Sequence, residues 1–235
     1  MRTIEQRFHA TMVLSLVAFT LYAQHAPVVP TGAMRATMAH GQLAGLIQLD
    51  SIASPGYYGV GPLEYLRGEL LLLDGQAYCA TAITDSTMQV DLRPAARAPF
   101  FVHQRVERWV ALPLPDSVAD LRALDAYLTA HFGMDAAPFA FRLTGHFDAV
   151  DVHVLDVPPG TEVRQRSDAQ RHNKHYHLRH TDAEAIGFFS TRHKTVFTHH
   201  DAHIHVHAIT PTRDWMGHAE ELMFRAAQVR LWVAE

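Results

Sequence analysis

The chain has 235 residues, of which 48% are hydrophobic and 19% are charged. This length and composition are typical of a folded globular protein and exclude an intrinsically disordered chain. The formal net charge of −4 argues against a basic surface for nucleic acid or anionic lipid. The one cysteine, Cys79, excludes an intrachain disulfide and a zinc site built from several thiolates.

The N-terminus has the pattern of an export signal. Arg2 and Arg7 precede an apolar run over residues 10–23 (ATMVLSLVAFTLYA) that is too short to span a bilayer. We therefore predict a signal peptide over residues 1–23 and a secreted or periplasmic protein. The alternative is a buried N-terminal helix in a cytoplasmic protein. The rest of the sequence also contains no stretch that is long and apolar enough to cross a membrane.

Periodicity and Gly/Pro punctuation predict the elements of the first half. The clearest signal is a hairpin over residues 69–79 that turns at Asp74-Gly75. The other elements expected here are a linker at 24–32, a helix at 33–48, a loop at 54–62, and strands at 88–92 and 100–111.

Pro113 and Pro115 break the chain before the second half. Asp116 or Ser117 can cap a helix over residues 117–131, because apolar residues recur there at helical spacing. The remaining expected elements are strands at 139–143, 149–157, 184–190, 203–209 and 229–233, with a long polar loop at 158–183.

The same order of elements, a helix followed by several strands, occurs twice. It predicts an α+β fold of two related helix-plus-antiparallel-sheet units, 33–112 and 113–235, packed as one compact protein. The second unit carries the candidate metal-binding strands. No sequence repeat between the halves accompanies this order, so the internal duplication rests on element order alone.

Histidines in the segment 201–218 have the spacing of metal ligands. Alternate side chains of a strand share a face, so His203, His205 and His207 point to one side. Neighbours in this series lie roughly 6.6 Å apart between Cα atoms, which allows two imidazoles to bind one ion. His203 and His207 are too far apart to do so. One neighbouring pair therefore supplies two ligands, and a third comes from elsewhere.

His218 is the natural third ligand. Residues 210–217 (TPTRDWMG) are predicted to turn the chain back beside the first strand, and Gly217 permits a close backbone approach. Three protein ligands leave coordination positions open, which is typical of catalytic rather than structural sites. The alternative is a solvated, histidine-rich strand that binds no metal.

Four blocks of the sequence resemble the acetolactate decarboxylase family, in the family's order. Residues 205–218 (HVHAITPTRDWMGH) are similar to its His-x-His and Gly-Gly-His metal-binding segment. Residues 56–75 (GYYGVGPLEYLRGELLLLDG) resemble its Gly-x-Gly, Gly-Glu and Leu-Asp-Gly run. Residues 139–147 and 185–190 resemble two further blocks. Together the blocks extend over most of residues 33–220.

The resemblance implies two related α+β units, a Zn²⁺ ion held by His205, His207 and His218, and a functional glutamate at Glu69. It also implies a homodimer that converts 2-acetolactate, or a similar small 2-hydroxy-3-oxo acid, to acetoin and CO₂. Loss of CO₂ beside a ketone places negative charge on oxygen that a Lewis acid stabilises, and a positioned acid protonates the carbon. The alternative for Glu69 is a solvent-facing strand residue.

Two departures from the family pattern concern the same site. The family places an active-site arginine in a Val-x-x-Arg pattern, where this chain has Val150-Asp-Val-His153. His153 could bind a carboxylate or donate a proton, and Arg142 could substitute for the missing arginine or be a strand-surface charge. The family's acidic C-terminal tail is not expected in a sequence that ends at Glu235.

Two other classes of protein use related motifs. A DNA-binding-associated domain carries a similar His-x-His and Gly-Gly-His strand pair, so a non-enzymatic zinc-binding protein is the alternative function. The acidic composition, the expected duplication and the export signal argue against nucleic acid as a partner. A cupin would carry a glutamate soon after its His-x-His, and residues 208–213 contain none.

Overall fold

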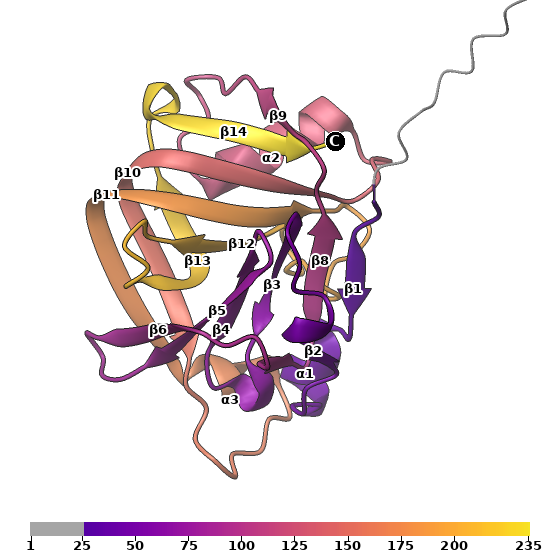
Figure 1. The fold of residues 1–235 in the computed structure, drawn as a ribbon, viewed down its shortest axis with the longest axis vertical. Coiled ribbons are helices and arrows are strands. Elements are labelled where there is room, and N and C mark those ends of the chain that lie inside the picture. The colour runs from indigo at the N-terminus through magenta and orange to yellow at the C-terminus, as the bar shows by residue number, and fades with distance from the viewer. Residues whose placement is uncertain (1–25) are drawn as a thin grey trace, which may run out of the picture.

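The computed structural model describes residues 26–235, which form antiparallel sheets with few helices (Figure 1). The signal peptide predicted over residues 1–23 lies outside the described residues, as does the start of the predicted linker. Within residues 26–235, no helix combines the length and apolarity that a bilayer crossing requires.

The first sheet is built from the N-terminal part of the chain. Its strands, in spatial order, are β1 (Val29–Thr31), β8 (Phe101–Arg105), β3 (Tyr57–Pro62), β4 (Glu69–Leu73), β5 (Gln76–Ala82) and β6 (Met88–Leu92). The predicted hairpin is confirmed: β4 and β5 are joined by Asp74 and Gly75, both at positive φ. A short ribbon pairs β2 (Ile47–Gln48) with β7 (Arg97–Ala98).

The second sheet contains two strands of 17 residues that run side by side (Figure 1). Its order is β11 (Asn173–Phe189), β12 (Ile204–Ile209), β13 (Met216–Met223), β10 (Phe139–Leu155), β14 (Val229–Ala234) and β9 (Trp109–Leu112). Because β10 also pairs with β11, the pairings of β10, β11, β12 and β13 close into a ring. The turn predicted between β12 and β13 is confirmed by their antiparallel pairing.

Several predicted loops are wrong. The segment 158–183 contains α3 (Arg166–Gln170) and the first half of β11, which pairs with β10 along its whole length. Backbone hydrogen bonds to β10 therefore stabilise this polar part of β11. Its sequence contains few apolar residues because one face of the strand is solvated. The strands expected at 139–143 and 149–157 are parts of the continuous β10, and β1 occupies part of the expected linker.

The glycine-rich segment predicted as a loop at 54–62 is largely strand β3. Gly59 and Gly61 serve packing there: a Cβ at Gly59 would lie 2.4 Å from the Phe101 ring, and one at Gly61 would lie 2.5 Å from a backbone oxygen. Glycine in a strand marks such a close approach as well as a turn. The strand expected at 100–111 is two strands, β8 and β9, in different sheets.

The two main helices are shorter than predicted. The first, α1 (Met34–His40), ends at Gly41 in the left-handed conformation instead of continuing to residue 48. The second, α2 (Leu121–Phe132), begins later than expected because Asp120 caps it, with its carboxylate accepting the Ala123 amide at 2.7 Å. Three short 3₁₀ turns complete the elements: η1 (Leu49–Ser51), η2 (Glu64–Leu66) and η3 (Ala226–Gln228).

The predicted internal duplication is not confirmed. The longest strand of the first sheet has seven residues, whereas the second sheet is organised by two strands of 17. The strand β9, from the end of the predicted first unit, pairs with β14 in the second sheet. Antiparallel sheets with few helices therefore describe the fold, and the two sheets differ in construction.

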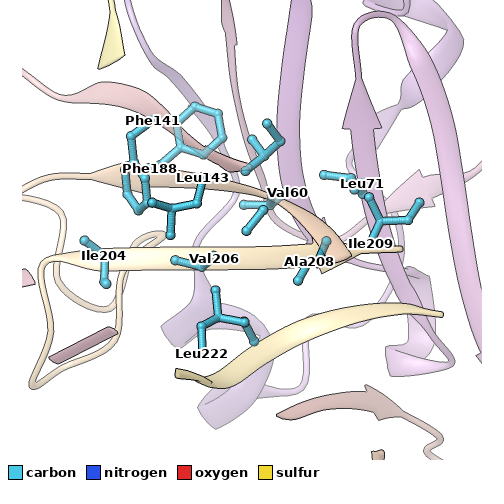
Figure 2. Close-up of a cluster of buried hydrophobic side chains, with 14 of the residues drawn as sticks. Val60, Leu71, Phe141, Leu143, Phe188, Ile204, Val206, Ala208, Ile209 and Leu222 are labelled. Atoms are coloured by element: carbon cyan, nitrogen blue, oxygen red, sulfur yellow. The ribbon is translucent and has the colours of Figure 1, made fainter. Parts of the chain in front are cut away.

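The main core lies between the sheets and within the ring of pairings (Figure 2). Val60 and Leu71 of the first sheet belong to the same buried cluster as Phe141 and Leu143 of β10. On β12 three alternating apolar residues of this cluster are Ile204, Val206 and Ala208 (Figure 2). Strand alternation consequently turns the intervening histidines, 205 and 207, to the opposite face of β12.

Gly187 of β11 provides a test of this packing. It pairs with Phe141 on one side and with Val206 on the other, and a Cβ there would lie 2.2 Å from the Phe141 ring. We expect Gly187→Ala to lower the free energy of unfolding by roughly 1–3 kcal/mol. Adding Phe141→Leu should recover part of this loss, since leucine lacks the clashing ring atoms. Urea unfolding of both single variants and the double variant would show additive losses if the explanation were wrong.

Candidate metal centre

The strand register aligns four histidines in one row across the second sheet. His175 on β11 pairs with His153 on β10, which pairs with His218 on β13, which in turn pairs with His207 on β12. Adjacent strands lie roughly 4.8 Å apart, so neighbours in this row are within side-chain reach. The row joins residues from distant parts of the sequence at one place on the sheet.

The three predicted ligands meet at one end of this row. Nε2 of His205 lies 3.2 Å from Nε2 of His207 and 3.1 Å from Nδ1 of His218, and all three side chains are buried. The three ligand atoms lie within 4.8 Å of one another, and no other such cluster occurs in residues 26–235. His205 and His207 are thus the neighbouring pair whose ring nitrogens come together, and His218 joins them.

These imidazoles are suited to hold a divalent metal ion. Two nitrogens on one tetrahedral zinc at 2.0–2.1 Å lie roughly 3.3 Å apart, close to the distances found between the three side chains. Burial lowers the pKa of His205 to about 3 and that of His207 and His218 well below its usual range. The three rings are therefore neutral, which is the form that binds a metal.

His203, the first histidine of the alternating series, is not part of the cluster. Its Nδ1 lies 3.0 Å from the Thr129 hydroxyl and 3.2 Å from the Asp125 carboxylate, both on α2. Its backbone amide also donates to Asp125 at 2.9 Å. His203 thus attaches the start of β12 to α2.

Glu69 approaches the three histidines from the first sheet. It begins β4, and strand alternation places it on the same face as Leu71 and Leu73, which pack against the second sheet. Its carboxylate oxygens lie 3.7 Å from Nε2 of His207 and 3.8 Å from Nε2 of His153. Burial raises the pKa of Glu69 well above its usual range, which favours the protonated acid near neutral pH.

His153 lies between Glu69 and a second carboxylate, Glu220. Its Nδ1 is 3.0 Å from one oxygen of Glu220, whose other oxygen is 2.9 Å from Nδ1 of His175. The hydrogen bond from His153 is the main cause that lowers the pKa of Glu220 to about 2, so this carboxylate is ionised. Glu220 therefore fixes the His153 ring with Nε2 directed toward Glu69.

His199 and Arg166 border the cluster on another side. The His199 ring lies parallel to that of His218, with centroids 5.1 Å apart and an interplanar angle of 7°. Its Nδ1 lies 3.2 Å from a guanidinium nitrogen of Arg166. Burial, and then the positive charge of Arg166, lower the pKa of His199 to about 4.

Arg142, the other candidate for the missing arginine, lies elsewhere. Its Nε is 2.7 Å from the Glu184 carboxylate on the neighbouring strand. It is not among the residues that line the cavity at the histidine cluster. The structure thus brings together five of the six predicted site residues: Glu69, His153, His205, His207 and His218.

A cavity of about 690 Å³ opens onto the cluster. Its volume is within the range of small-molecule sites. Its polar lining includes the histidine cluster, Arg122 and Arg166, and its apolar wall includes Met34, Met38 and Phe100.

Glu220, His199 and Arg166 are the site residues that the sequence analysis did not predict. Glu220 had a usable signal, because it lies two residues after His218 on the same face of β13.

Known proteins share this fold and part of this sequence. A family model described as alpha-acetolactate decarboxylase matches residues 31–235. Comparison with curated protein sequences finds no match.

Solved structures also resemble the chain. The alpha-acetolactate decarboxylase of Bacillus subtilis strain 168 shares 17% identity, with 89% of this chain and 85% of that chain covered and a TM-score of 0.73. The acetolactate decarboxylase of Bacillus subtilis subspecies spizizenii shares 16% identity over 89% and 86%, with a TM-score of 0.73. A Staphylococcus aureus protein of unknown function, described as similar to alpha-acetolactate decarboxylase, shares 18% identity over 88% and 84%, with a TM-score of 0.71. At these identities the structural likeness shows the fold.

Exchange of single histidines on β12 tests the metal centre. We expect the purified protein to bind one divalent ion per chain, and His207→Gln to bind much less because a three-ligand site loses one ligand. His203→Gln is the matched control, since His203 directly precedes β12 but bonds to α2. Elemental analysis after equilibration with Zn²⁺ measures the difference. Equal metal contents in the two variants would contradict this assignment.

Proposed function

Because the chain belongs to the alpha-acetolactate decarboxylase family, a family of carbon–carbon lyases, we propose that it converts 2-acetolactate to acetoin and CO₂ with zinc at the three-histidine centre. The observation that carries this proposal is the convergence of three buried imidazoles beside a buried glutamate, at the wall of a cavity. The family match over residues 31–235 favours this function over the non-enzymatic alternative.

Zinc is the metal we propose because all three ligands are imidazole nitrogens. Three-histidine sites with an open position are typical of catalytic zinc, whereas magnesium and calcium prefer oxygen ligands. A zinc ion bound there would act as a Lewis acid for the negative charge that develops on the substrate oxygens when CO₂ leaves. The remaining roles belong to side chains of this chain.

Glu69 is the proposed proton donor. Decarboxylation breaks one C–C bond, and its electron pair passes to the neighbouring carbonyl group, so one carbon must then accept a proton. The burial that raises the pKa of Glu69 keeps a proton on its carboxyl group at neutral pH. Nothing else in the wall of the cavity combines burial, acidity and contact with a ligand histidine: Asp125, Asp201 and Glu220 each face a histidine other than the three ligands.

His153 positions this acid. Glu220 accepts a hydrogen bond from Nδ1 of His153 in the protonation state we propose, and Nε2 then faces Glu69 at 3.8 Å. An imidazole in this position can orient the Glu69 carboxyl group and contact a polar substrate atom. Arg142 receives no substrate contact in this proposal, since its partner is Glu184.

Two further features of the proposal concern the whole protein. The family resemblance supports a homodimer, and the sequence of residues 1–23 supports export to the periplasm or the medium. Light scattering of the purified protein would detect the dimer, and N-terminal sequencing of the exported protein would locate the cleavage site.

Glu69→Gln provides the activity test. We expect zinc-loaded protein lacking residues 1–23 to release acetoin from racemic 2-acetolactate, and Glu69→Gln to lower kcat by roughly 10²- to 10⁴-fold through loss of the acid. Its zinc content should stay near that of the unchanged protein. Glu221→Gln is the control, because Glu221 is exposed on β13 and does not line the cavity. Full activity in Glu69→Gln would eliminate Glu69 as the proton donor.

A further inference from the structure

Arg166 is held in the cavity wall by the fold of its own segment. It is the first residue of α3, whose start is fixed by the buried Asp168 carboxylate, which accepts the amides of Arg164 at 3.0 Å and Gln165 at 3.1 Å. Ala169 of the same helix packs in a small apolar cluster with Leu155, which also lines the cavity. The backbone position of Arg166 is therefore set independently of its side chain.

The guanidinium of Arg166 is oriented by two imidazole rings. One terminal nitrogen donates to Nδ1 of His200 at 2.8 Å and the other lies 3.2 Å from Nδ1 of His199. No carboxylate in residues 26–235 forms an ion pair with Arg166. A partly buried cation that is positioned but not neutralised is suited to bind an anion.

The acidic residues of the cavity wall face imidazoles and form no ion pair with Arg166. Asp125 faces His203 at 3.2 Å, Asp201 faces His200 at 3.6 Å, and Glu220 bonds to His153 and His175. Glu69 is buried against the histidine cluster. Arg166 and Arg122 are the arginines of the cavity wall, and neither forms an ion pair within residues 26–235.

Arg166 also has the shorter connection to the metal centre. Its guanidinium contacts His199, and the His199 ring is stacked on His218. One imidazole thus separates the cation from a ligand of the cluster. Arg122 is exposed on the first turn of α2 and has no comparable support.

We infer that Arg166 is a substrate-binding residue that holds the carboxylate of a small 2-hydroxy acid beside the metal centre. For the identity of the substrate, this inference rests on the proposed decarboxylation. Arginine suits this role because its planar fork can donate two parallel hydrogen bonds to a carboxylate. The negative charge leaves the carboxyl group as CO₂ departs, so the contact stabilises the bound substrate more than the transition state. Loss of Arg166 should therefore raise KM more than it lowers kcat.

The direct test compares an anionic with a neutral ligand. Titration calorimetry on zinc-loaded protein would measure the Kd of 2-hydroxy-2-methylpropanoate and of its amide, which differ in charge and hardly in shape. We expect Arg166→Gln to reduce the preference for the anion by roughly 10- to 100-fold, the range for one charged hydrogen-bonded pair. Arg164→Gln is the matched control, since it removes the same charge two residues away, where Glu162 is the partner.

Further variants separate the possible outcomes. Arg166→Lys keeps the positive charge without the planar guanidinium, so it should lose part of the preference for the anion. This variant also tests the inference if Arg166→Gln does not fold. An unchanged preference in Arg166→Gln, or a loss confined to Arg122→Gln, would overturn the inference. If the protein releases no acetoin but its anion preference depends on Arg166, the proposed reaction fails while the binding role stands. If acetoin is released and the KM of Arg166→Gln is unchanged, the proposed reaction stands and the binding role of Arg166 fails.

Discussion

The register between β10, β11, β12 and β13 is the constraint on which the site depends. Backbone pairing of these strands places His175, His153, His218 and His207 in one row. Side chains alternate between faces with a period of two, so a slip of one residue would turn a strand's histidine to the other face. The apolar residues of β12 oppose such a slip, because it would move Ile204 and Val206 out of the apolar core and put histidines in their place.

Burial gives the groups around this row different protonation states. The three imidazoles are neutral because charging them in the interior is unfavourable, and the same cause favours the protonated form of Glu69. Glu220 differs because hydrogen bonds from two histidines stabilise its charged form. Two carboxylates on either side of His153 thus have opposite states, as is common where one group donates a proton and another orients its neighbour.

The part of the site that local sequence rules describe could be predicted. Alternation placed His205 and His207 on one face, and the turn before Gly217 predicted that His218 returns beside them. The motif resemblance located Glu69, whose position near the cluster depends on contact between the two sheets.

The remaining part depends on long-range pairing that leaves little trace in local pattern. Residues 173–183 read as a loop because their apolar residues are few, so His175 was not expected in the row. Arg166 reaches the cavity only through the docking of α3, a helix of five residues without an amphipathic signal. The true helix starts and ends were set by Asp120 and Gly41, which local rules recognise only once the neighbouring elements are known. The repeated order of elements did not reflect two similar sheets.

We propose that decarboxylation requires one metal ion at the three-histidine centre. This proposal is tested most directly by returning Zn²⁺ in steps to metal-stripped protein and measuring bound zinc and acetoin release on the same samples. We expect the rate to rise in proportion to bound zinc and to reach a plateau at one ion per chain. Full acetoin release by the stripped protein, or no release at one bound zinc per chain, would contradict it.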